Sequence, residues 1–142
     1  LVHTPSITLM SPTVQGNFPN YAEVIPSETN RKVTLETEEF AHRIRQAALV
    51  TTEESSGVKF TFDKKTVTLS SRSPESGEAE IVCPAELNGD PMEIGFNPAF
   101  LIDALRVVSS DSITVEMNAP SKPAVLKSGR QFLYVLMPVD LK

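Results

Sequence analysis

The chain is organised around the stretch Gln-Phe-Leu-Tyr-Val-Leu-Met-Pro-Val-Asp-Leu-Lys, residues 131–142. Its six consecutive apolar residues, 132–137, have the length and the β-branched and aromatic content of a buried strand, which Pro138 ends. Val139 and Leu141 follow, although domain termini are usually polar unless something ties them down. The sequence therefore predicts a closing strand and then a docked apolar tail.

Composition and length indicate one soluble domain with an appendage. The 142 residues are 40% hydrophobic and 22% charged, and no apolar run approaches the roughly 18 residues that a membrane span needs. The lone cysteine, Cys83, excludes an internal disulfide and is compatible with a reducing cytoplasm, which is the expected location. A net charge of −5 argues against a coat of basic residues for tight nucleic-acid binding, but it does not exclude a local basic face.

Apolar periodicity predicts a series of strands and two helices. The strands are expected at 6–10, 32–36, 58–63, 66–71, 78–83, 92–96, 113–117, 124–127 and 131–137. The first helix is expected to take Thr37 as its N-cap, and the second to take Asn97, with Pro98 at the first helical position. Their buried stripes are predicted as Phe40, Ile44, Ala47 and Ala48 in the first helix and Leu101, Ala104, Leu105 and Val108 in the second.

Residues 11–27 contain three prolines and predict an extended connector between the first two strands. The connector nevertheless carries four apolar side chains, Phe18, Tyr21, Val24 and Ile25, whereas a free linker would be more polar. We therefore expect it to lie pinned against a surface.

The predicted elements form a pattern that occurs twice. A strand, a helix and three strands are followed by the same series, and a shift of sixty residues places Phe40 over Phe100 and the cap Thr37 over Asn97. The predicted fold class is α+β, with two βαβββ repeats, internal pseudo-twofold symmetry and two helices packed side by side on antiparallel sheets.

The residue types that catalysis needs are sparse. A nucleophilic enzyme needs a base within reach of its nucleophile. Here the histidines are His3 in the frayed start and His42 on a helix surface, and Cys83 alternates with Ile81 as a packing residue would. No common metal, nucleophile-elbow or phosphate-loop motif occurs, so neither a catalytic residue nor a cofactor or metal is predicted.

Three surface features indicate partners more readily than chemistry. The carboxylate pairs Glu53–Glu54 and Glu78–Glu80 could serve metal or acid–base work, but a solvated edge or a charged docking surface is the simpler interpretation. Leu49 is apolar on an otherwise polar helix face and is a candidate contact with another subunit. If both helices line one surface, basic residues there would attract a phosphate backbone without reading sequence. These residues are Arg31, Lys32, His42, Arg43, Arg45 and Arg106.

Two sequence blocks carry a family resemblance. Gly-Asn-Phe-Pro-Asn-Tyr-Ala-Glu-Val-Ile-Pro at 16–26 and Tyr-Val-Leu-Met-Pro at 134–138 resemble the bacterial sliding clamp, the β subunit of DNA polymerase III, as does Met-Glu-Ile-Gly-Phe-Asn at 92–97. The resemblance implies a subunit of three similar domains. Residues 1–27 would then be the last strand of the second domain plus the linker, and 28–142 the third domain. A start at Leu1 fits a fragment of a longer protein.

The resemblance also implies a non-catalytic processivity factor and its partners. Two full-length subunits would close into a ring around duplex DNA and bind it weakly and without sequence preference, with no membrane involved. Replicative polymerase, clamp loader and repair proteins would bind one cleft through a short linear motif. The implied cleft residues are Pro19, Val24, Asn97, Phe100, Pro123, Val135, Met137, Pro138, Val139 and Leu141. The implied subunit interface is Leu49, Val50, Glu78 and Glu80, and the implied DNA-facing residues are His42, Arg45 and Arg106.

Some positions depart from the family pattern. Ala22 and Glu23 stand where relatives often carry basic residues, and Asp140 replaces a common arginine. The alternative function is a small-ligand-binding α+β domain with an apolar pocket between helices and sheet. An enzyme is a third alternative, which the missing catalytic groups disfavour.

Overall fold

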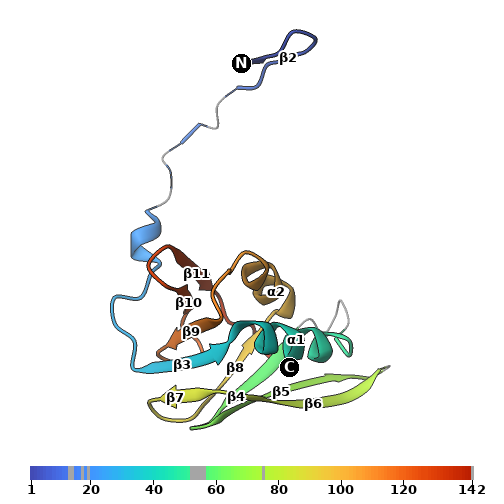
Figure 1. The fold of residues 1–142 in the computed structure, drawn as a ribbon, viewed down its shortest axis with the longest axis vertical. Helices are drawn as coiled ribbons and strands as arrows, with labels where there is room; N and C mark the ends of the chain where they lie inside the picture. Colours follow the sequence, from blue (N-terminus) through green and yellow to red (C-terminus); the bar gives the residue numbers. More distant parts are fainter. Residues whose placement is uncertain (13–14, 17, 19, 52–56, 75, 142) are drawn as a thin grey trace.

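The computed structural model describes residues 1–12, 15–16, 18, 20–51, 57–74 and 76–141. Figure 1 shows a body of two sheets and two helices, from which the first part of the chain projects. Before the body come β1 (Val2–His3), β2 (Thr8–Leu9) and the 3-10 helix η1 (Tyr21–Glu23). The body consists of β3 (Arg31–Glu36), α1 (Thr37–Ala48), β4 (Val58–Phe62), β5 (Thr66–Ser73), β6 (Gly77–Pro84), β7 (Glu86–Asn88), β8 (Met92–Phe96), α2 (Pro98–Arg106), β9 (Ser112–Met117), β10 (Ala124–Ser128) and β11 (Phe132–Leu136).

The two halves of the chain exchange their first strands. The five-stranded sheet has the order β11-β10-β9-β3-β7, and the four-stranded sheet has the order β6-β5-β4-β8. Thus β3, which precedes α1, pairs with β9 after α2, while β8, which precedes α2, pairs with β4 after α1; both pairs are antiparallel. Each sheet therefore needs both halves, and the predicted α+β fold with two βαβββ repeats is confirmed. The short strand β7 was not predicted.

The two helices begin with different caps. The Glu36 side chain accepts hydrogen bonds from the backbone N–H groups of Glu38 (3.1 Å) and Glu39 (2.5 Å). The prediction of Thr37 as N-cap is therefore wrong: Thr37 is the first helical residue, and its buried hydroxyl donates to the Ser110 carbonyl at 2.7 Å. In α2 the prediction is confirmed, because Asn97 accepts from the Ala99 N–H at 2.9 Å.

The caps also correct the register of the repeat. Glu36 and Asn97 are 61 residues apart, one more than the predicted shift. With that shift Phe40 aligns with Leu101, and each is 1% exposed, whereas Phe100 is 52% exposed. One position on a helix is a rotation of 100°, which is enough to move a side chain from the core to the surface. Val108 also lies beyond α2 and is only half-buried.

The core joins α1 to the four-stranded sheet through phenylalanine rings. The Phe60 ring lies 6.2 Å from Phe40 and 5.5 Å from Phe96, both edge-to-face, and 6.2 Å from Phe62. Such pairs contribute about 0.5 to 1.5 kcal/mol beyond the area they bury. This cluster fixes the sheet on which the end of the chain docks.

The described apolar residues of the connector differ in burial, and the chain is anchored to the body just after the connector. Phe18 and Tyr21 are 85% and 68% exposed, so the predicted pinning is wrong for these side chains, which belong to the projecting segment in Figure 1. Residues 28–30 are held to the loop after β9. The Asn30 N–H donates to Asn118 Oδ1 at 2.9 Å, and Asn118 Nδ2 donates to the Glu28 carbonyl at 2.5 Å.

Candidate functional site

The tail that follows β11, residues 137–141, is seated on β8. The Val139 N–H donates to the Gly95 carbonyl at 2.9 Å. Met92, Ile94 and Phe96 belong to the core, so the intervening Gly95 faces the outer side of the sheet. Gly95 is nevertheless buried, because a Cβ built on it would lie 2.7 Å from the Leu141 side chain. The predicted docked tail is confirmed.

This seating gathers most of the predicted cleft residues. Asn97 follows Gly95 by two residues, and Phe100 lies in the first turn of α2, an element that contacts β11. Pro123 directly precedes Ala124, which pairs with Leu136, so Pro123 lies beside the start of the tail. Val135 pairs with Val125 in the same ladder.

The gathered residues leave apolar surface exposed. Met137 is 59% exposed, Phe100 52% and Leu141 43%, while Pro138 and Val139 are half-buried. Exposed apolar side chains in one place are typical of an interaction site.

The connector residues of the predicted cleft are not brought into this group. Val24 is 50% exposed, and its backbone N–H donates locally to the Tyr21 carbonyl. Pro19 lies outside the described residues. The predicted cleft residues between 97 and 141 thus lie near one another, and their role as a binding cleft stays a prediction, as does the part contributed by the connector.

Gly57 and Gly95 belong to the site but were missed in the sequence. Their lack of side chains is what lets the tail approach the sheet. A glycine inside a strand often marks such a close approach, so Gly95 in β8 carried a usable signal.

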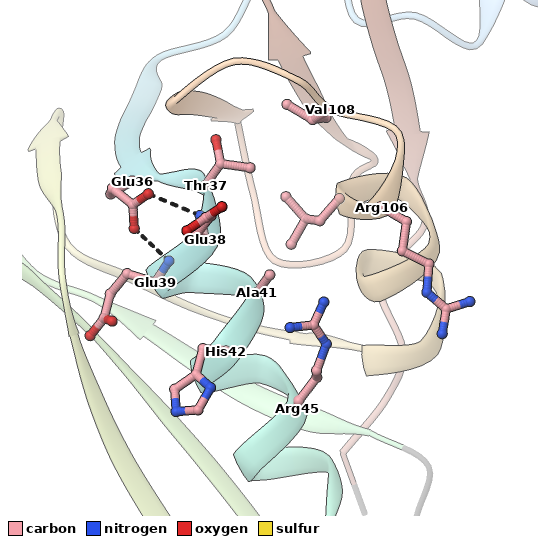
Figure 2. A pocket seen from close by; sticks show the side chains of 10 residues that line it. Glu36, Thr37, Glu38, Glu39, Ala41, His42, Arg45, Arg106 and Val108 are labelled. Atoms are coloured by element: carbon pink, nitrogen blue, oxygen red, sulfur yellow. Dashed lines mark hydrogen bonds between the residues drawn. The ribbon is translucent and has the colours of Figure 1, made fainter.

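A second surface lies between the two helices (Figure 2). The groove has a volume of about 690 Å³. Its lining is Glu36, Thr37, Glu38, Glu39, Ala41, His42, Arg45, Leu105, Arg106 and Val108. All three residues predicted to face DNA thus line one groove, and Figure 2 shows the Arg45 side chain reaching from α1 toward α2.

The charge of this groove is mixed. Its lining holds three glutamates, Glu36, Glu38 and Glu39, and two arginines, so its formal charge with a neutral histidine is −1. Arg106 lies 3.3 Å from the Asp103 carboxylate, whereas none of the ion pairs among the described residues involves Arg45. The groove as a whole is therefore not the locally positive surface that was expected, although Arg45 and Arg106 place two positive charges in it.

A third surface lies at the free edge of the four-stranded sheet, on β6. The Ser71 hydroxyl donates to the Ala47 carbonyl at 2.8 Å, and Ser71 pairs with Ala79 of β6. The C-terminal end of α1 is therefore held near this edge, with Leu49 82% exposed.

The other predicted interface residues lie at this end of α1 or on β6. Val50 is half-buried, and both Glu78 and Glu80 are exposed. Glu78 pairs with Arg72 at 3.0 Å, but both side chains are well exposed, and such pairs contribute little. An edge strand offers unpaired backbone groups to another chain.

Cys83 is not a reactive thiol. It is 1% exposed, and burial raises its pKa from 9.0 to about 11, with the nearby Glu39 carboxylate adding to the rise. The thiol therefore stays protonated at neutral pH, as its predicted packing role requires. The predicted pair Glu53–Glu54 lies outside the described residues.

Two further statements hold for the part of the chain that the structure describes. In it, no three His, Cys, Asp or Glu side chains come together in a way that could hold a metal ion. None of its helices is long and apolar enough to cross a membrane.

Known proteins resemble the chain over nearly its whole length. The family model for the "DNA polymerase III beta subunit, C-terminal domain" matches residues 22–140. The chain is 30% identical over 140 residues to the beta sliding clamp of Chlamydia pneumoniae, and the match covers 99% of this chain and 38% of that protein.

Solved structures agree with this similarity. A DnaN sliding clamp from Bartonella birtlesii bound to griselimycin matches with a TM-score of 0.85 and 32% identity over 89% of this chain and 35% of that one. The DNA polymerase III β subunit from Thermotoga maritima matches with a TM-score of 0.87 and 27% identity over 91% of this chain and 36% of that one. The chain thus spans less than two-fifths of each of these relatives.

Proposed function

Because this chain belongs to the DNA polymerase III β subunit family, the bacterial sliding clamps, we propose that it serves as the third domain of a clamp subunit. The observation that carries this proposal is the family match over residues 22–140. Residues 1–27 then comprise the last strand of the second domain and the linker, and 28–142 the third domain. The short β1–β2 hairpin and the anchoring of residues 28–30 to Asn118 support this division.

The full-length protein acts as a non-catalytic processivity factor in the cytoplasm. Two subunits form a ring that encircles duplex DNA, and the groove of His42, Arg45 and Arg106 faces the phosphate backbone. Arg45 and Arg106 supply positive charge for salt-sensitive contact with phosphates without sequence reading, and the three glutamates of the lining keep this contact weak. The β6 edge with Leu49, Val50, Glu78 and Glu80 forms part of the contact between subunits.

The exposed apolar group beside the tail is the binding cleft for client proteins, which include the replicative polymerase, the clamp loader and repair proteins. Each apolar side chain that a client buries contributes about 1.5 to 3 kcal/mol. Two or three such side chains, less the cost of ordering the peptide, give roughly micromolar affinity. Exchange between clients is then fast. The solved Bartonella relative bound to griselimycin is consistent with a ligand-binding family.

A peptide titration tests the proposal. A fluorescein-labelled peptide carrying the clamp-binding motif of a polymerase is titrated with the 142-residue chain. Saturable anisotropy at tens of micromolar or below is expected, and Met137→Glu should abolish it. The proposal fails if the wild-type chain gives no saturation and the same peptide also fails to bind a full-length subunit containing these residues.

The alternative of a small-ligand domain has less support. It requires an apolar pocket between the helices and a sheet, and Phe40, Phe60 and Phe96 pack together in that space. A ligand that copurifies with the chain and is lost on denaturation would favour this alternative.

A further inference from the structure

Two glycines form a slot on the outer face of the four-stranded sheet. Gly95 pairs with Lys59 across the β4–β8 ladder, and Gly57 directly precedes Val58, which pairs with Phe96. Side chains alternate along a strand, and Val58, Phe60, Ile94 and Phe96 all face the core. Gly57, just before β4, and Gly95, in the neighbouring strand β8, therefore both face outward. We call this pair the glycine slot.

The tail fills the glycine slot so closely that no side chain fits beneath it. A Cβ at Gly57 would lie 2.7 Å from Leu141 Cδ2 and 3.1 Å from Val139 Cγ2. A Cβ at Gly95 would lie 2.5 Å from the Val139 carbonyl oxygen and 2.7 Å from Leu141 Cγ. Neither glycine has a positive φ. The backbone at these positions therefore tolerates alanine, and it is the tail that excludes it.

The glycine slot holds one end of a short segment, the residues from Leu136 to Val139. At the other end, Leu136 pairs with Ala124 and is 2% exposed. Only Met137 and Pro138 lie between Leu136 and the Val139 N–H that is bound to Gly95. Pro138 adds a fixed φ angle. With both ends held, the backbone of Met137 has little freedom, and the direction in which its side chain leaves the chain is fixed.

We propose that Gly57 and Gly95 are positioning residues, which seat Val139 and Leu141 and thereby hold Met137 in the orientation that a client peptide meets. The effect on clients rests on the proposed function, but the seating of the tail does not. Releasing the tail would return its conformational freedom, and a client would have to order it again on binding.

The substitution Gly57→Ala tests the slot, because the atoms that its Cβ would meet are side-chain ends in the tail. The first measurement is hydrogen exchange of the Val139 amide in the 142-residue chain, which should become about tenfold faster when its hydrogen bond is lost. The second is the Kd for the labelled client peptide, which should rise about three- to tenfold.

Two further variants make the result specific. Leu141→Ala removes the Cδ2 atom that a Cβ at Gly57 would meet at 2.7 Å and leaves the Val139 Cγ2 contact at 3.1 Å, so adding Gly57→Ala to it should speed Val139 exchange clearly less than Gly57→Ala does in the wild type. Gly129→Ala controls for general destabilisation, because its φ is +57° and a Cβ there meets nothing within 4 Å. Gly129→Ala should leave the Kd unchanged. It should also speed exchange of the Val139 amide no more than exchange of amides in the strands of the body.

The possible results distinguish a failure of the positioning role of the glycine slot from a failure of the proposed client binding. If Gly57→Ala leaves Val139 exchange unchanged, or speeds exchange equally in β4 and β8, the slot is not a positioning device and the inference is overturned. If Gly57→Ala does not fold, Leu141→Gly removes the contact from the side of the tail and should speed Val139 exchange in the same way; unchanged exchange there overturns the inference. If the wild-type chain and a full-length subunit bind no client peptide, the proposed function fails, while Val139 exchange still decides the seating.

Discussion

Shortening the Met137 side chain should weaken the binding of client peptides while the fold survives. The side chain is 59% exposed, and a bound peptide can cover that part of it. Full burial of a methionine stabilises by about 1.5 to 3 kcal/mol, so 59% of it corresponds to about 0.9 to 1.8 kcal/mol. Since about 1.4 kcal/mol is a tenfold change in affinity, Met137→Ala should raise the Kd about 4- to 20-fold.

The measurement is fluorescence anisotropy of the labelled client peptide, with urea unfolding of the same samples. The part of Met137 that is already buried, 41% by difference from 59%, should cost about 0.6 to 1.2 kcal/mol of unfolding free energy. Val107→Ala is the matched control, because Val107 is 71% exposed but lies at the C-cap of α2, outside the predicted cleft. A Kd that changes less than twofold for Met137→Ala, or equally for both variants, would refute the reasoning.

Three further predictions concern groups that hold these surfaces in place. The Cys83 thiol has its pKa raised from 9.0 to about 11, so the folded chain keeps this proton while the unfolded chain begins to lose it near pH 9. The stability of the wild type relative to Cys83→Ala should hence be constant below pH 9 and fall above it by up to about 1.4 kcal/mol per pH unit. A flat difference in urea unfolding between pH 8 and 10.5 would contradict this. Asn97→Ala should lose about 0.5 to 2 kcal/mol of unfolding free energy, whereas Asn97→Asp keeps the acceptor for Ala99 N–H and should lose much less; equal losses would exclude the capping role. Ser71→Ala removes one of the donors to the buried Ala47 carbonyl, which keeps the Val50 N–H at 3.5 Å, and should cost about 0.5 to 1.5 kcal/mol in the same assay; no loss would contradict this role.

The sequence alone determined which residues form the body and which of them face inward. Strand alternation placed Phe60 and Phe62 in the core, and both are at most 1% exposed. The Asn97-Pro98 pair predicted where α2 begins, because a side-chain acceptor followed by a residue without an N–H suits a helix start. The apolar residues after Pro138 predicted a docked tail. These features depend on periodicity and on chemistry within a few residues.

Only the tertiary structure decided which segments meet. The exchange of β3 and β8 between the two sheets joins residues about 80 positions apart in one case, Val33 with Val115, and about 34 in the other, Phe60 with Ile94. No local pattern states such a pairing. The tertiary structure also decided that Glu36, and not Thr37, caps α1. The Thr37 hydroxyl instead donates to the Ser110 carbonyl, which belongs to the other half of the chain.

The tail depends on both the sequence and the tertiary structure. Its apolar residues indicated that it docks, but the surface that receives it is made by two glycines, one just before β4 and one in β8, which lie side by side only after folding. A glycine inside a strand pattern can indicate that another segment comes close, but it does not say which segment that is. The sequence therefore determined that residues 139–141 are held, and the packing of β4 against β8 decided where.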